Sequence, residues 1–316
     1  MKSTQATLSQ TKTALVLSGG SMLGAFQAGA IAHLLDQGFK PDVVMGISAG
    51  ALNGTFLVHE AGRMNGHTDW PDIGAKLKDF WVSRVRHPRD LIRRRFLLLQ
   101  LWRILTHRFN GWYDYRPLVK IIQDEFKLTH LRKSPVDLVV GAVDWTGGEI
   151  EYPDKGHPLL IDYIIASASI PVILPYWRIK DRPYVDGGMR DVAPLRQLVD
   201  KGIEEVVVIL TQPERFPKPK YAPGNLFPFI ERIIELMLSE ILENDLAQLE
   251  KINQQINSLP SGKSEAEGVL AGKRYIKCTV IRPERAYEVG LGDFSPKDVQ
   301  QLISDGHQAV DKARIN

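Results

Sequence analysis

Two glycine turns dominate the first sixty residues of this 316-residue chain, and each lies between a strand-like run and a helix-like run. The first apolar run, Ala14 to Leu17, ends at Gly19-Gly20, and apolar residues then recur at helical spacing until Gly38. The second run, Asp42 to Met45, leads directly into Gly46-Ile47-Ser48-Ala49-Gly50 and another helix. Strands joined through a helix lie parallel, so both turns are expected at the carboxyl edge of one sheet.

The second turn matches the pattern G-x-S-x-G, in which a serine lies on a sharp strand-to-helix corner with its hydroxyl exposed. Ser48 is that serine. Gly46 and Gly50 are expected because a Cβ at either position would crowd the neighbouring backbone. The helix that follows directs free N–H groups toward the place where an oxyanion would form. The alternative is a glycine-rich turn with no chemistry.

The first turn, Gly19 to Gly24, suggests either a phosphate-binding loop or an oxyanion hole. A dinucleotide loop would require glycine where Ser21 stands, and an acidic residue where Met45 and Gly46 stand. We therefore favour an oxyanion hole made of backbone N–H groups beside Ser48.

Together these blocks resemble the patatin-like phospholipases. Residues 18–30, SGGSMLGAFQAGA, resemble the glycine-rich turn of that family, residues 46–50 its nucleophile elbow, and residues 184–188, YVDGG, its D-G-[GA] block. The resemblance implies a serine lipid acyl hydrolase of the phospholipase A, lysophospholipase or esterase type. It implies a Ser48–Asp186 dyad, and an oxyanion hole formed by Gly19, Gly20 and Ser21. Ser21 departs from the usual third glycine, and Leu23 stands where many members have arginine or lysine.

Asp186 is the expected general base because it follows a short strand-like run and precedes two glycines. Burial would raise its pKa from near 4 toward a value suited to that role. Asp144 is a rival carboxylate, although capping of its own turn is the more natural role. A Ser–His–Asp triad would need His307, the only histidine after Asp186, but that histidine lies in a helix-like segment.

Residues Arg84 to Phe109 have the most unusual composition, with eight arginines and one acidic residue around an apolar centre. One interpretation is a helical lid or interfacial segment that makes a peripheral membrane contact, with arginines on anionic headgroups. The other is a buried helix whose arginine-rich end reaches water. Gln100, Arg103 and His107 argue against a membrane-spanning helix.

The composition excludes several classes of protein. With 44% hydrophobic and 24% charged residues, the chain resembles an ordinary globular protein, and its net charge of +3 gives no reason to expect a nucleic-acid partner. Its one cysteine, Cys278, excludes an internal disulfide framework, and its eight histidines lack the spacing of metal ligands. We therefore expect no metal and no cofactor, a lipid or acyl-ester partner, and a cytoplasmic location with or without membrane association.

The order of strand-like and helix-like segments predicts an α/β fold, a three-layer αβα sandwich around a mostly parallel sheet. We expect a polar tail over 1–13, the patatin-like catalytic domain over 14–212, and a C-terminal extension of helix and strand over 213–316 packed on that domain. Finer expectations are a loop over 59–75 with surface histidines His59 and His67, one buried strand from Val136 to Val143, and a small-residue stretch from Ala166 to Pro175 near the nucleophile. Three hypotheses for function follow: the hydrolase, an acyltransferase that uses the same acyl-enzyme, and a catalytically weak, membrane-associated protein of the same fold.

Overall fold

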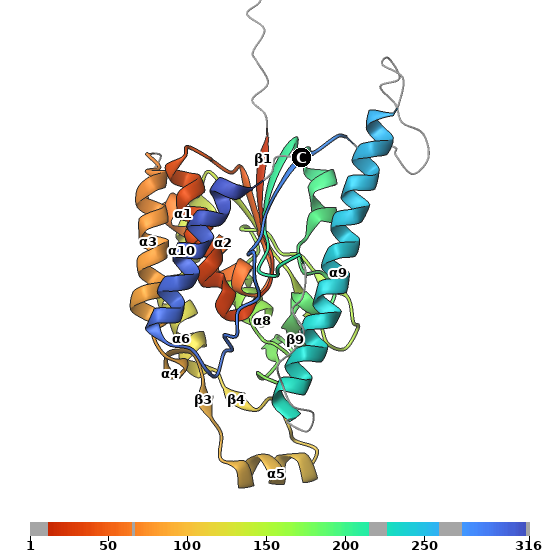
Figure 1. Ribbon diagram of the computed structural model, residues 1–316. Coiled ribbons are helices and arrows are strands. Elements are labelled where there is room, and N and C mark those ends of the chain that lie inside the picture. The colour runs from red at the N-terminus through yellow and green to blue at the C-terminus, as the bar shows by residue number, and fades with distance from the viewer. Residues whose placement is uncertain (1–11, 65–66, 215–225, 259–273, 314–316) are drawn as a thin grey trace, which may run out of the picture.

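The computed structural model describes residues 12–64, 67–214, 226–258 and 274–313. Its main sheet has five strands in the order β11-β10-β1-β2-β5, and every neighbouring pair is parallel. All carboxyl ends therefore meet at one edge, the lower edge in Figure 1. These strands are β1 (Thr13–Leu17), β2 (Val43–Gly46), β5 (Asp137–Val140), β10 (Glu205–Ile209) and β11 (Lys277–Ile281).

Helices cover both faces of this sheet, which confirms the three-layer α/β fold (Figure 1). Alternate side chains of β1 enter different cores. Leu15 and Leu17 pack with the layer that contains α1, α2, α3 and α10, while Ala14 and Val16 pack with the layer that contains α9. The helices are α1 (Gly24–Asp36), α2 (Ala49–Arg63), α3 (Trp70–Arg84), α4 (Pro88–Leu91), α5 (Leu97–Leu105), α6 (Arg116–Glu125), α7 (Leu128–Lys133), α8 (Leu160–Ser167), α9 (Leu226–Asn257) and α10 (Pro296–Lys312).

A second, antiparallel sheet has the strand order β7-β6-β9-β8, from β6 (Ala142–Asp144), β7 (Ile150–Glu151), β8 (Trp177–Ile179) and β9 (Arg182–Asp186). The prediction of one strand over 136–143 is wrong, because the chain leaves the main sheet at Gly141 and enters this second sheet. A Cβ at Gly141 would lie 2.3 Å from Cδ1 of Ile47, so glycine allows the bend against the nucleophile turn. In the second sheet Ala142 is paired with Asp186, which brings the expected base to the carboxyl edge of the main sheet.

The prediction of a loop over 59–75 is also wrong in part. The helix α2 continues to Arg63, and α3 begins at Trp70. Gly62 does not end α2 but lets it pack closely on α7, since a Cβ there would lie 1.9 Å from the carbonyl oxygen of His130. His59 is consequently buried, whereas His67 is exposed.

Residues 84–109 do not form the single helix expected. After α3 ends at Arg84, the chain forms α4, then β3 (Arg93–Arg94), then α5, and returns through β4 (Tyr113–Asp114). A new helix, α4, begins after His87, where Oδ2 of Asp90 accepts from the backbone N–H groups of Arg86 and His87 at 3.0 Å and 2.9 Å. Leu91, at the end of α4, and the next residue, Ile92, are buried in the core. By contrast, α5 extends from the body on β3 and β4 (Figure 1).

Two expected segments are only partly described. Most of the polar tail expected over 1–13, and part of the C-terminal extension expected over 213–316, fall outside the described residues. The described part of the C-terminal hundred residues contributes β11 to the edge of the main sheet and α10 to the layer beside α1.

Candidate active site

Ser48 lies between β2 and α2, at the carboxyl edge of the main sheet. Its backbone has φ 54° and ψ −122°, a conformation that L-residues rarely adopt and that costs free energy. Only 5% of Ser48 is exposed to solvent. Such a strained serine on a strand-to-helix corner is the geometry expected of a nucleophile elbow.

The two glycines around Ser48 are required by close backbone contacts. A Cβ at Gly46 would lie 2.4 Å from the carbonyl oxygen of Gly50, and a Cβ at Gly50 would lie 2.3 Å from that of Leu17. A larger residue at Gly46 would push β2 and α2 apart, and a larger residue at Gly50 would push α2 away from β1. The crowding expected from the sequence is therefore present on both sides of Ser48.

Asp186 ends β9 and is 5% exposed. The hydroxyl of Ser48 is a hydrogen-bonding neighbour that lowers the pKa of this carboxylate, and the N–H of Gly188 donates to Oδ1 at 2.8 Å. Burial raises the pKa of Asp186 to about 7, while these two hydrogen bonds oppose the rise. The structure thus brings together the serine and the carboxylate that the sequence singled out.

The small-residue stretch around α8 holds both of these residues through their backbones. The N–H of Ser48 donates to Oγ of Ser167 at 2.9 Å, and the N–H of Asp186 donates to the carbonyl oxygen of Ser169 at 3.0 Å. Ser169 also shares a hydrogen bond with the hydroxyl of Tyr115 at 3.0 Å. The sequence predicted a close approach of this stretch, but it gave no signal for these hydrogen bonds.

The first glycine turn packs directly against Ser48, because a Cβ at Gly19 would lie 3.4 Å from Cβ of Ser48. The N–H of Gly19 donates to the carbonyl oxygen of Val192 at 3.1 Å and is therefore already used. The backbone N–H groups of Gly20 and Ser21 have no acceptor among the described residues. Of the three expected oxyanion donors, these two remain available.

A buried polar network that no sequence pattern indicated joins this turn to the elbow. Nδ2 of Asn53 in α2 donates to the carbonyl oxygen of Gly24 at 2.8 Å and to Oε1 of Gln27 at 3.1 Å. Nε1 of Trp81 in α3 donates to Oδ1 of Asn53 at 2.8 Å, and Gln27 reaches the carbonyl oxygen of Ser18. The network fixes α1 on α2, and so it fixes the first turn relative to Ser48.

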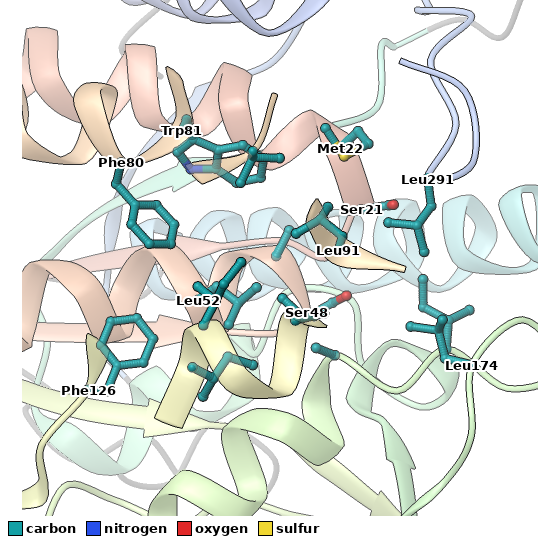
Figure 2. Close-up of a pocket in the computed structure, with 17 residues that line it drawn as sticks. Ser21, Met22, Ser48, Leu52, Phe80, Trp81, Leu91, Phe126, Leu174 and Leu291 are labelled. Atoms are coloured by element: carbon teal, nitrogen blue, oxygen red, sulfur yellow. The ribbon is translucent and has the colours of Figure 1, made fainter. Parts of the chain in front are cut away.

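An apolar pocket lies beside Ser48 (Figure 2). Ser21 and Ser48 carry the hydroxyl groups in it, and Figure 2 shows Phe80 and Phe126 at the opposite side from Leu174 and Leu291. The lining comes from α2, α3, α4, α6 and the stretch after α8. A cavity with apolar walls and a single polar corner is suited to an acyl chain whose ester group lies at that corner.

Two other side chains that could act on Ser48, those of Asp144 and His59, make contacts away from it. Oδ1 of Asp144 accepts from the N–H of Thr146 at 2.9 Å, and its Oδ2 accepts from Arg182 at 2.7 Å, which is the turn-capping role expected. His59 lies between Glu60 and His130, at 3.2 Å and 3.0 Å. Neither group is arranged to activate Ser48.

His307 belongs to a different cluster, between α1 and α10. Its ring stacks on that of His33 with centroids 3.7 Å apart, and Nε2 of His33 lies 2.8 Å from Oδ1 of Asp311. Ligand atoms of these three residues lie within 4.8 Å of one another, the kind of grouping that can hold a metal ion. The sequence did not predict it, because His33 and His307 are distant in the chain.

Comparison with known proteins agrees with the motifs. A family model described as patatin-like phospholipase matches residues 15–199. The lysophospholipase NTE1 sequences of two Cryptococcus neoformans var. neoformans serotype D strains, JEC21 and B-3501A, are each 24% identical over 198 residues, or 62% of this chain. The chain spans only 11% of the length of these curated relatives.

Two solved structures also match. VipD from Legionella pneumophila is 13% identical with a TM-score of 0.44, covering 96% of this chain and 67% of that one. A chain of the complex of SpcU with ExoU from Pseudomonas aeruginosa is 16% identical with a TM-score of 0.28, covering 76% and 52%. Since the family model extends over more than half of the chain, this protein belongs to the patatin-like phospholipase family.

Proposed function

We propose that this protein is a serine lipid acyl hydrolase, a carboxylic ester hydrolase with Ser48 as nucleophile and Asp186 as general base. One observation carries the proposal: a strained, buried serine is the hydroxyl neighbour of a buried carboxylate, and burial raises the pKa of that carboxylate to about 7. Such a carboxylate accepts a proton near neutral pH more readily than an ordinary aspartate.

In this mechanism Asp186 takes the hydroxyl proton of Ser48 as the serine Oγ attacks the ester carbonyl carbon. The carbonyl electron pair moves onto oxygen, and the N–H groups of Gly20 and Ser21 stabilise that negative charge. When the tetrahedral intermediate collapses, the C–O bond to the leaving alcohol breaks, and the alcohol takes the proton from Asp186. Water then attacks the acyl-enzyme by the same route and releases a carboxylic acid.

The proposed substrate is a lipid or other acyl ester. Apolar walls beside Ser48 support an acyl chain, and the relatives named lysophospholipases support a phospholipid or lysophospholipid. The proposed dyad could serve a phospholipase A, a lysophospholipase or an esterase.

Labelling with a fluorophosphonate probe, followed by peptide mapping, tests the dyad. We expect modification at Ser48, none in Ser48→Ala, and labelling slowed about a hundredfold or more in Asp186→Asn. Ser304→Ala, an exposed serine on α10, is the matched control and should label like the wild type. If Asp186→Asn is labelled at the wild-type rate, or if the probe modifies a residue other than Ser48, the proposed dyad is wrong.

An acyltransferase is the second candidate, because the pocket that accepts the acyl chain excludes much water from Ser48. Adding glycerol or a lysolipid as acceptor and measuring both products separates the two, since transfer exceeding hydrolysis favours the acyltransferase. Vesicle binding without any ester turnover would instead favour a catalytically weak membrane protein of the same fold.

We further propose a peripheral contact between residues 84–109 and a membrane. No helix among the described residues combines the length and apolar character that crossing a bilayer requires. The cytoplasmic location and the lack of a nucleic-acid partner stay predictions.

A further inference from the structure

Helix α5 presents an unusual amount of apolar surface to solvent. Phe96, Leu98 and Leu105 are 85%, 82% and 79% exposed, and Leu97 is also mostly exposed. Figure 1 shows α5 beyond the body of the protein, held by β3 and β4. Exposed apolar residues that lie together in this way mark an interaction surface.

The apolar surface runs around most of α5 instead of along one face. At 100° per residue, Leu99, Leu98 and Ile104 lie on widely separated sides of the helix, and all three are exposed. Gln100 is the exception: it is buried, and its Nε2 donates to the carbonyl oxygens of Gly111 and Trp112 at 2.8 Å and 3.1 Å. A flat protein partner would cover one side, whereas lipid can surround every side except the one that Gln100 ties to the protein.

Positive charge surrounds this helix. Arg93 and Arg94 precede it and are exposed, Arg103 lies within it, and Arg108 follows it with its guanidinium 5.7 Å from the ring centroid of Trp102. Burial lowers the pKa of Arg95, and the charge of Arg103 adds to that effect. The positive charges complement anionic lipid headgroups, each contributing about 1 kcal/mol near such a surface.

A second apolar strip lies at the same end of the molecule. Phe229, Ile233, Leu236 and Met237 follow helical spacing in the first half of α9 and are each exposed by about half. Figure 1 places this half of α9 at the end of the body from which α5 extends. This is also the end where the carboxyl edge of the main sheet holds Ser48.

The segment that Gln100 ties to α5, Gly111 and Trp112, is connected by backbone hydrogen bonds to the wall of the active-site pocket. The N–H of Trp112 donates to the carbonyl oxygens of Val172 and Ile173 at 3.1 Å and 3.0 Å, and a Cβ at Gly111 would lie 2.5 Å from the carbonyl carbon of Leu174. Leu174 lines the pocket with Ser48. Val172 is a β-branched residue with φ 69°, a strained backbone conformation. It lies in the segment to which Trp112 is hydrogen-bonded.

We infer that α5 inserts into the interface of a bilayer that contains anionic lipids, so that the pocket mouth faces the membrane from which the substrate comes. The inference deepens the proposed function and rests on it for the identity of the substrate. Membrane binding itself is independent of whether Ser48 is active.

Co-sedimentation of the full chain with vesicles tests the inference. Vesicles of phosphatidylcholine with one third phosphatidylglycerol are compared with vesicles of phosphatidylcholine alone, and the wild type should partition at least about tenfold more strongly to the anionic ones. The double variant Leu98→Asp/Leu105→Asp should lose at least about tenfold in partitioning, because each aspartate must leave water. Arg93→Glu/Arg94→Glu should lose the preference for anionic vesicles.

The matched control is Arg274→Glu/Tyr275→Asp, which changes one exposed arginine and one exposed aromatic residue before β11, at the amino edge of the sheet. It should bind vesicles like the wild type. Circular dichroism and the melting temperature show whether each variant is folded.

Three outcomes would overturn the inference: Leu98→Asp/Leu105→Asp binds like the wild type, neutral and anionic vesicles bind equally, or light scattering shows a dimer that this variant dissociates. The last outcome would assign α5 to a second copy of the chain. Hydrolysis of a short soluble ester by the wild type is measured in parallel. Vesicle binding without that hydrolysis would contradict the proposed function and leave the membrane contact standing.

Discussion

At the scale of single residues, two serines with positive φ mark the site. Ser48 has φ 54° and Ser21 has φ 51°, and a side chain in this region costs roughly 1–2 kcal/mol. The strain at Ser48 accompanies the hydroxyl that the proposed reaction needs. At Ser21 the proposed reaction needs only the backbone N–H, and the resemblance to patatin-like proteins places a glycine there.

We therefore expect Ser21→Gly to stabilise the protein by about 0.5–1 kcal/mol, because relief of strain exceeds the added entropy of the unfolded chain. Urea unfolding measures the change. Ser239→Gly is the control, since Ser239 lies inside α9 and glycine should destabilise that helix by about 0.5–1 kcal/mol. A loss of stability in Ser21→Gly would show that the Ser21 hydroxyl makes a stabilising contact.

The pKa of Asp186 predicts how activity depends on pH. The carboxylate must be deprotonated to accept the serine proton, and burial raises its pKa to about 7. Below pH of about 7, kcat/KM for a soluble ester should fall about tenfold per pH unit, and above it should level off. A plateau that extends down to about pH 5 would mean that another group is the base.

The same carboxylate predicts how stability depends on pH. Its pKa is about 7 in the folded protein and about 4 in the unfolded chain, so the folded state binds the extra proton between these values. The free energy of unfolding should therefore fall as pH rises from about 4 to about 7, by up to about 1.4 kcal/mol per unit.

Asp186→Asn should lose the part of that slope that Asp186 contributes, which urea unfolding at several pH values would reveal. Asp191 contributes in the same direction, since burial raises its pKa to about 6, so Asp191→Asn is the reference variant. An unchanged slope in Asp186→Asn would contradict the assignment.

At the scale of elements, the sequence predicted the parts whose reasons are local. The strand before each turn, the elbow and the two glycines around Ser48 follow from patterns within a few residues. The change of chain direction at Gly141 does not follow from such local patterns, because the bend depends on Ile47, which is far away in the sequence. Likewise Gly62 reads as a helix breaker until α7 packs against it.

The candidate site divides in the same way. Ser48 and Asp186 carry recognisable motifs, whereas the serines that hold their backbones, Ser167 and Ser169, resemble any small residues at a helix end. The prediction of a single helix over residues 84–109 was wrong for a related reason. Helical spacing alone does not tell which part of an apolar run is covered, and here Leu91 is buried while Leu98 is exposed.

The packing of α1 on α10 gives a prediction at this scale. A Cβ at Gly306 would lie 1.9 Å from the carbonyl oxygen of Phe26, so Gly306→Ala should destabilise by about 1–3 kcal/mol although alanine favours helix. Thermal unfolding measures the effect, and Ser304→Ala on the exposed side of α10 should change little. A neutral Gly306→Ala would mean that the two helices can separate at no cost.

At the scale of the whole molecule, the site depends on segments far outside the family match, which ends at residue 199. Thr211 packs on Gly20, where a Cβ would lie 2.1 Å from its Oγ1, and Leu291 lines the pocket. β10 pairs with β1, and β11 pairs with β10. The first glycine turn and the pocket are thus completed by the later third of the chain.

Removing residues 213–316 should therefore abolish folding instead of trimming an accessory segment. The loss uncovers the core side chains that face Val299, Leu302 and Val310 of α10, each worth about 1.5–3 kcal/mol on burial. Together with the contacts of β11 and α9, this approaches the roughly 5–15 kcal/mol by which a whole protein is stable. The shortened chain should show no cooperative melting by calorimetry and should bind a dye specific for exposed apolar surface. A sharp thermal transition would instead mean that residues 14–212 fold as a unit and that the C-terminal segment is added to a finished domain.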